Sequence, residues 1–358
     1  MLAKGYLAIV LHAHLPYVHH PEHEDFLEED WFFEGLSETY LPLLDILQRL
    51  HQEQIPTHLT LALSPPLCSM FEDPLLRERF LKRLQKHRAL AEQEWVRARH
   101  NKALLEVVEL YHQRIEHQIR QYQKLNADLV RAFSFYQEQG MIEICTCSAT
   151  HAFLPLMANH PVAVRAQIQV AVQEHTRLFG QAPKGIWLPE CAYYPGLDQF
   201  LLEAGLRFFF LDSHGVTQAV PKPMYGVYAP IYTPTGMAVF GRDIESSKQV
   251  WSGQEGYPGD YDYRDFYRDI GYDRPIEEIH PYIQPTGARK NTGFKYHRIT
   301  GLTNHKELYR PRQAIAKAHL HAEHFVQERV RQIQLCVSSM GRAPVIVAPY
   351  DAELFGHW

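Results

Sequence analysis

The sequence predicts an α/β protein, most simply an incomplete (β/α)7 barrel with a helical region inserted into it. Seven short stretches are apolar throughout, not in alternation, which is typical of parallel strands buried on both faces. Patterns of helical spacing fill most of the intervals, and such alternation indicates a barrel or a doubly wound sheet. No G-x-G-x-x-G or phosphate-binding loop follows a strand, which disfavours nucleotide-binding folds.

The expected elements follow one another along the whole chain. The strands are expected at 5–12, 57–63, 141–147, 184–189, 206–212, 237–241 and 344–350. Amphipathic helices are expected at 36–52, 160–180, 195–205 and 310–334. Gly180 and Gly205 stand where glycine commonly ends a helix. We therefore interpret residues 1–358 as one barrel domain.

Two segments depart from this alternation. Residues 73–139 are almost wholly helical in pattern and highly charged, and we expect a helical insertion there, between the second and third strands. Residues 244–308 are loop-like and rich in Gly, Pro, Tyr, Asp and Arg. Loops of that length inside a compact domain are usually functional. With Trp251 and several tyrosines among its glycines, this segment is expected to be an active-site loop and not a mobile surface loop.

Polar residues follow nearly every expected strand. The chain reads "HAHLPY" after the first, "SATH" after the third, "PECAY" after the fourth and "DSH" after the fifth, with "RD" and "YDAE" after the last two. Convergence of such residues at the carboxyl ends of the strands is the layout of an active site in a (β/α) barrel. This pattern favours the barrel over the doubly wound sheet.

The amino-acid composition limits the kinds of partner that this protein is expected to bind. The net charge is -5 and the pI is about 6.5, so the chain lacks the basic surface expected of a protein that binds nucleic acid or an anionic membrane. The first residues do not resemble a signal peptide, and no run approaches the ~20 apolar residues of a membrane helix. The five cysteines are scattered, which indicates reduced, mostly buried thiols. We expect a cytoplasmic protein; its oligomeric state is left open.

Two carboxylates are candidates for catalysis. Glu190 follows the strand that ends near Trp187, and Asp351 ends the last strand. Retaining cleavage of a glycosidic bond requires a nucleophile and an acid/base about 5–5.5 Å apart. Residues so distant in sequence meet only if both strands belong to one barrel. Glu353 competes with Asp351, and is otherwise an orienting or helix-entry residue.

The "HAH" motif has a second interpretation as a metal site. His12 and His14 stand at i and i+2 on a strand end, so their side chains point to the same side. Together with His151, His214 and Asp351 they could supply the ligands of a zinc ion. The rival interpretation is that the histidines bind substrate hydroxyls without a metal, which we favour because no such metal enzyme explains "WLPECAY".

Several motifs resemble glycoside hydrolase family 57. "HAHLPYV" (12–18), "GMIEICTCSATHAFLPLM" (140–157), "GIWLPECAY" (185–193) and "PYDAELFGHW" (349–358) are similar to conserved regions of that family. They are most similar to the versions found in its 1,4-α-glucan branching enzymes, as is "WSGQEGYPGDYDYRDFYRDIGYD" (251–273). The resemblance extends over essentially the whole chain.

The resemblance implies a retaining mechanism without metal or other cofactor. Glu190 would be the nucleophile and Asp351 the proton donor. The further residues expected to contact substrate are Arg242, Asp243, Gly259, His12, His14, His151, Trp31, Trp187, Trp251, His357 and Trp358.

The implied activity is that of a branching enzyme, which cleaves α-1,4 links and forms α-1,6 branches in a glycogen- or starch-like glucan. The alternatives are a 4-α-glucanotransferase or an α-amylase of the same family. Because family members continue into a C-terminal helical domain, we expect that domain to be absent from this chain. A third alternative is therefore an inactive remnant that only binds α-glucan.

Overall fold

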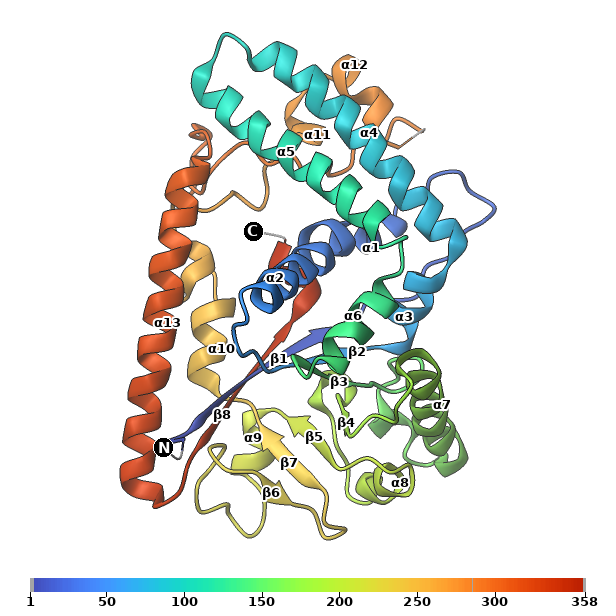
Figure 1. Cartoon of the computed structure of the whole chain (residues 1–358), viewed down its shortest axis with the longest axis vertical. Coiled ribbons are helices and arrows are strands. Elements are labelled where there is room, and N and C mark those ends of the chain that lie inside the picture. The colour runs from blue at the N-terminus through green and yellow to red at the C-terminus, as the bar shows by residue number, and fades with distance from the viewer. Residues whose placement is uncertain (1–2, 285, 357–358) are drawn as a thin grey trace.

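The computed structural model describes residues 3–284 and 286–356. Among these, seven parallel strands form the barrel wall (Figure 1). They are β1 (Tyr6–Ala13), β2 (Leu59–Leu63), β3 (Ile142–Cys145), β4 (Gly185–Ile186), β5 (Phe208–Leu211), β7 (Ala238–Gly241) and β8 (Val345–Asp351). The predicted α/β barrel is confirmed.

The strands form two four-stranded sheets that together make the wall. One has the order β3–β2–β1–β8 and the other β4–β5–β7–β6. A parallel bridge between Thr146 and Ile186 joins β3 to β4. On the opposite side β7 and β8 form no ladder, and the Asp243 N–H donates to the Val347 carbonyl at 2.8 Å instead. The barrel is therefore incomplete at this seam between β7 and β8.

The remaining strand, β6 (Ile231–Tyr232), pairs antiparallel with β7. This strand was not predicted from the sequence, because two residues give no detectable period. β4 is also shorter than predicted, ending at Ile186 just before Trp187, Leu188 and Pro189. Proline cannot donate to a sheet ladder, so the strand has no means of continuing through that residue.

Helices cover the barrel and extend beyond it. Around the wall lie α1 (Glu29–Gly35), the π-helix η1 (Leu36–Tyr40), α2 (Leu41–Gln52), α3 (Pro65–Glu72), α7 (Pro161–Phe179), α8 (Leu197–Glu203), α9 (Ser213–Thr217) and α13 (Pro311–Met340). Short 3-10 turns are η2 (Leu154–Met157), η3 (Pro189–Cys191) and η6 (Ala352–Gly356). No helix in 3–284 or 286–356 is long and apolar enough to cross a membrane.

Between β2 and β3 the chain forms three further helices beyond α3. They are α4 (Pro74–Ala98), α5 (Lys102–Lys124) and α6 (Leu129–Glu138). Asp73 and Asn101 cap the first two, each accepting hydrogen bonds from backbone N–H groups of the first turn. Figure 1 shows α4 and α5 as a long pair that reaches beyond one end of the barrel.

The segment 244–308, predicted as a loop, contains short helices. They are α10 (Ile244–Trp251), η4 (Tyr257–Gly259), α11 (Ile270–Asp273), α12 (Ile276–Ile279) and η5 (His280–Tyr282). Part of it is fastened to α13, because the hydroxyls of Tyr257 and Tyr263 lie 2.8 Å from Nδ1 of His324 and His321. The buried carboxylate of Asp269 accepts four hydrogen bonds from residues 271–293 and fixes the next turn.

Candidate active site

Three histidines lie together at the carboxyl ends of β1 and β3. His12 is near the end of β1, His14 follows it, and His151 lies in the loop after β3 on a left-handed backbone with φ 54°. The rings of His14 and His151 stack with centroids 3.6 Å apart, and those of His12 and His151 with centroids 5.2 Å apart. The structure thus brings together His12, His14 and His151, three of the histidines predicted at the site.

Hydrogen bonds connect this cluster to Asp351, which pairs with His12 in the β1–β8 ladder. His12 Nδ1 lies 3.1 Å from Asp351 Oδ1, and His12 Nε2 lies 3.2 Å from His151 Nε2. An ionised carboxylate only accepts, so neutral His12 must carry its proton on Nδ1 when Asp351 is ionised. His12 Nε2 is then an acceptor, and His151 donates to it. His14 Nδ1 is bonded to Ser64 Oγ at 2.9 Å.

Burial keeps two of these histidines uncharged. Loss of solvent is the main reason that the pKa of His14 is lowered to about 4, and the charge of His12 adds to it. The pKa of His151 is lowered to about 3 by the same loss of solvent and by the charges of His14 and His12. At neutral pH each ring is neutral and uses one nitrogen in the hydrogen bond already described, so each has one further nitrogen that suits a hydroxyl group.

Trp187 forms the floor beneath this cluster. Its ring stacks on that of His12 with centroids 4.6 Å apart and planes 15° apart. Only 3% of its surface is exposed, and it packs with Val10, Phe210 and Val347 inside the barrel. Trp187 therefore supports His12 from below and offers little open face to a sugar.

Glu190 stands on the other half of the barrel rim. It follows β4 within η3 and has a left-handed backbone, with φ 58° and ψ 21°. Its side chain is exposed and has no hydrogen bond or ion pair with any residue that the structure describes. Cys191, also left-handed with φ 52°, is mostly buried, and burial raises the pKa of its thiol to about 11. The thiol is thus protonated at neutral pH, so it is not poised as a nucleophile, and Glu190 remains the predicted one at this turn.

Asp212 at the end of β5 was not among the predicted site residues. Arg242, which follows β7, places Nε 3.5 Å from Asp212 Oδ2. Burial opposes ionisation of Asp212, but hydrogen bonds from Ser213 and the charge of Arg242 bring its pKa below the usual value. The carboxylate at the end of the stretch "LRFFFLD" was the available clue to this residue.

Glu353 lies behind Asp351 in η6. Burial is the main cause that raises the pKa of its carboxyl to about 8, and the charge of Asp351 adds to it. The carboxyl accepts a hydrogen bond from the backbone of His14. Glu353 is therefore placed to orient neighbouring residues, whereas Asp351 faces the histidines.

The remaining predicted contacts differ in exposure. Trp31 is 54% exposed, whereas Asp243 is 2% exposed. The Asp243 carboxylate accepts from Ser246 N at 2.8 Å, capping α10, and from Gln332 Nε2 at 2.7 Å. These bonds occupy it, so it is not free to bind substrate.

The two predicted contacts in 244–308 pack closely. Trp251 packs against Tyr350 and Phe355, with centroids 6.4 and 6.0 Å apart. Gly259 lies so close to Gly253 that an added Cβ would stand 2.1 Å from the Gly253 carbonyl oxygen. The predicted contacts His357 and Trp358 lie outside the described residues.

A possible set of metal ligands differs from the predicted one. His12, Cys147 and His151 place one ligand atom each within 4.8 Å of one another. The Nε2 atoms of the two histidines hydrogen-bond each other, however, and burial raises the pKa of Cys147 well above its usual value. A protonated thiol and engaged imidazoles do not suit an ion. His214 is 75% exposed at its side chain and bonds Asp212 at 3.3 Å.

Comparisons with known proteins identify relatives along the whole chain. The family model for glycosyl hydrolase family 57 matches residues 8–337. The 1,4-α-glucan branching enzyme TK1436 of Thermococcus kodakarensis is 33% identical, over 99% of this chain and 53% of its own length. This chain therefore spans about half the length of that relative.

Two solved structures extend the comparison. The α-amylase AmyC from Thermotoga maritima is 44% identical with a TM-score of 0.95, covering 99% of this chain and 69% of that one. The GH57-type branching enzyme from Pyrococcus horikoshii is 31% identical with a TM-score of 0.86, covering 99% of this chain and 64% of that one.

Proposed function

Because the chain belongs to glycosyl hydrolase family 57, we propose that it is a retaining enzyme of α-1,4-glucans that transfers the cleaved chain to form α-1,6 branches. One observation supports this most: Asp351, hydrogen-bonded to His12, and Glu190, whose carboxylate is not paired with any described residue, both stand at the carboxyl ends of strands of one barrel. A pair of carboxylates in that setting is the equipment of retaining glycosidases.

In the first step the Glu190 carboxylate attacks the anomeric carbon of an α-1,4-linked glucose. The glycosidic C–O bond breaks as the new C–O bond forms, and Asp351 gives its proton to the departing oxygen. Asp351 becomes a carboxylate at that moment. The His12 Nδ1–H, 3.1 Å from its Oδ1, stabilises the new charge.

In the second step a 6-hydroxyl of another glucan attacks the same carbon. Its proton passes to Asp351, the bond to Glu190 breaks, and both carboxyls return to their starting states. His14 and His151 are neutral at pH 7, and they are suited to hydrogen-bond the hydroxyls of the sugar held between the two carboxyl groups. The segment 244–308 is the proposed cover that keeps water from replacing the acceptor.

A second candidate function is α-amylase. It is favoured by the likeness to AmyC, which is stronger than the likeness to the branching enzymes in both identity and TM-score. The two activities share the first step and differ in whether a sugar hydroxyl or water completes the second.

For the branching reaction, the proposed setting is the synthesis of a glycogen- or starch-like glucan in the cytoplasm.

Incubation of the chain with amylose separates these functions. A branching enzyme creates α-1,6 links, measured by proton NMR and by the short chains that a debranching enzyme then releases, with few new reducing ends. Reducing ends without α-1,6 links would refute branching and support hydrolysis. Binding of amylose without either product would identify a remnant that only binds glucan. Glu190→Gln is the inactive control.

A further inference from the structure

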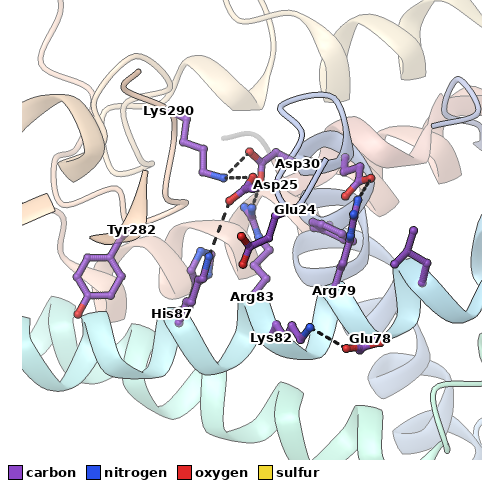
Figure 2. A pocket seen from close by; sticks show the side chains of 14 residues that line it. Glu24, Asp25, Asp30, Glu78, Arg79, Lys82, Arg83, His87, Tyr282 and Lys290 are labelled. Atoms are coloured by element: carbon purple, nitrogen blue, oxygen red, sulfur yellow. Dashed lines mark hydrogen bonds and ion pairs between the residues drawn. The ribbon is translucent and has the colours of Figure 1, made fainter. Parts of the chain in front are cut away.

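A charged cavity lies against the helix α4, and none of the residues that line it is among the predicted site residues at the strand ends. It has a volume of about 210 Å³ and is lined by α4, by residues 24–33, and by Tyr282 and Lys290. On α4 the lining residues recur every three or four positions from Leu75 to His87, so they form one face of the helix. Figure 2 shows Arg83 and His87 from α4 directed toward Asp25, Asp30 and Lys290.

The charges around this cavity balance. Its lining contains five Lys or Arg residues and five Asp or Glu residues. Arg79 pairs with Glu29 and Arg83 with Asp30, and Lys290 Nζ lies 2.9 Å from Asp30 Oδ2. Burial holds the pKa of His87 well below its usual value, so its ring adds no charge. A balanced lining does not select an ion, because either sign meets as much repulsion as attraction.

Three buried side-chain atoms at the cavity have no hydrogen-bond partner among the described residues. They are the acceptors Glu29 Oε2, on a side chain only 1% exposed, and Asp30 Oδ2, which is ion-paired with Lys290, and the donor Arg83 Nε. Nearly all buried polar groups in folded proteins are hydrogen-bonded, so these atoms require a partner. A hydroxyl group satisfies both kinds of atom, since it donates and accepts.

We propose that this cavity binds one sugar unit of an α-glucan chain, at a second site separate from the catalytic carboxylates. The ligand class, a neutral polyhydroxylated molecule, follows from the balanced charge and the unpartnered atoms; its identity as α-glucan rests on the proposed function. The volume is below the ~300–1,000 Å³ of typical small-molecule pockets, so it admits one unit and not an oligosaccharide.

The bound unit makes contacts of three kinds. One hydroxyl donates to Glu29 Oε2, and another accepts from Arg83 Nε. The ring of Tyr282 supplies an apolar face for the pyranose. Lys82 and Lys86, with side chains 65% and 57% exposed, stand where the rest of the chain leaves the cavity.

Affinity electrophoresis in gels containing glycogen tests the proposal in the full chain, in a Glu190→Gln background that prevents turnover. Leu75→Trp fills the cavity without removing an ion pair, and we expect it to weaken binding to glycogen at least fivefold. The matched control, Gln85→Trp, places the same ring on an exposed position of α4 outside the lining and should bind as the parent does. If Leu75→Trp lowers the unfolding temperature, Tyr282→Ala at the rim replaces it.

The outcomes distinguish this proposal from the proposed function. Equal binding by Leu75→Trp, or by Tyr282→Ala in its place, and by Gln85→Trp overturns the second site, whatever the chain does to amylose. Absence of any retardation by glycogen in the parent also overturns it. A chain that binds glycogen through Leu75 and Tyr282 but changes no amylose would refute the proposed function and leave the second site standing.

Discussion

The two halves of the barrel present their carboxylates in different ways. Asp351 ends a ladder that pairs Tyr6–His12 with Val345–Asp351, and it is hydrogen-bonded to His12. Glu190 follows a strand of only two residues, on a left-handed turn, with an exposed carboxylate that forms no hydrogen bond or ion pair with a described residue. In one half, a seven-residue strand ladder and a hydrogen bond to His12 fix the Asp351 carboxylate. In the other half, no described residue holds the Glu190 carboxylate by a hydrogen bond or ion pair.

This difference suits the two proposed roles. A group that gives and takes a proton needs a partner that stabilises its charged form at the right moment. A nucleophile that forms a covalent bond gains from having no hydrogen bond to lose. Strained backbone of the Glu190 kind is costly, about 1–3 kcal/mol per residue, and clusters at functional sites.

Removal of the nucleophile should have the largest effect. Glu190→Gln keeps the size of the side chain and abolishes its charge, so we expect turnover of amylose to fall at least ~10³-fold. The neighbouring change Cys191→Ala is the matched control and should leave turnover nearly unchanged, because the Cys191 thiol is protonated. Comparable losses in both variants would mean that the turn, and not the Glu190 carboxylate, carries the activity.

Loss of the partner of Asp351 should have the next largest effect. His12→Phe keeps a ring on Trp187 but removes the hydrogen bond to Asp351. We expect kcat to fall about 10²-fold, since small misplacements of catalytic groups cost that much, and the pH dependence of kcat to shift. An unchanged pH profile would show that His12 only packs.

A change in the 244–308 segment should have a smaller but still measurable effect on turnover. Gly259→Ala brings a Cβ to 2.1 Å from the Gly253 carbonyl, so the turn must move. We expect about a tenfold loss of kcat/KM through KM, in keeping with misplacement of a contact remote from the chemistry. Gly253→Ala meets no atom within 4 Å and is the control. Similar kinetics for both variants would argue against a role for this turn.

Acid should destabilise the protein through its buried histidines. The pKa is lowered from about 6.5 to about 4 in His14 and His175 and to about 3 in His151. Between pH 6.5 and 4 the unfolded chain binds more protons than the native one, so this contribution to stability is complete above pH 6.5 and is lost as pH falls. Thermal unfolding measured across that range should show the loss.

His175 separates stability from function in this experiment. Neither ring nitrogen has a partner among the described residues, and the residue is 3% exposed on α7. His175→Leu should therefore raise stability by about 1 kcal/mol at pH 5 and flatten the acid dependence, with activity unchanged. His151→Leu should flatten it too but reduce turnover. Equal activity in both would place His151 outside the site.

The main strands were predictable because each is a buried apolar run. The failures have physical causes. β6 is too short to show a period, and α10 was assigned to a loop although Asp243 is well placed to cap it. Capping depends on the direction of one side chain, which sequence spacing does not reveal.

The same limit applies to the site. His12 and Asp351 could be selected because they stand at strand ends. Arg242 and Asp243 are neighbours in the chain, yet one meets Asp212 and the other caps a helix. Adjacent residues leave an extended backbone on opposite sides, so proximity in sequence did not indicate a shared role.

The pairing of β1 with β8 also determines at which stage of folding the proposed site can form. His12 and Asp351 are separated by 339 positions, so the contact closes a loop that contains all the other strands of the barrel wall. Contacts of such long range form late, because the entropy of closing the loop must be overcome before they contribute. During synthesis His12, His14 and His151 are translated before β8, so they cannot contact Asp351 until β8 has been made. The contact between His12 and Asp351 is thus formed only after the rest of the barrel wall has been translated.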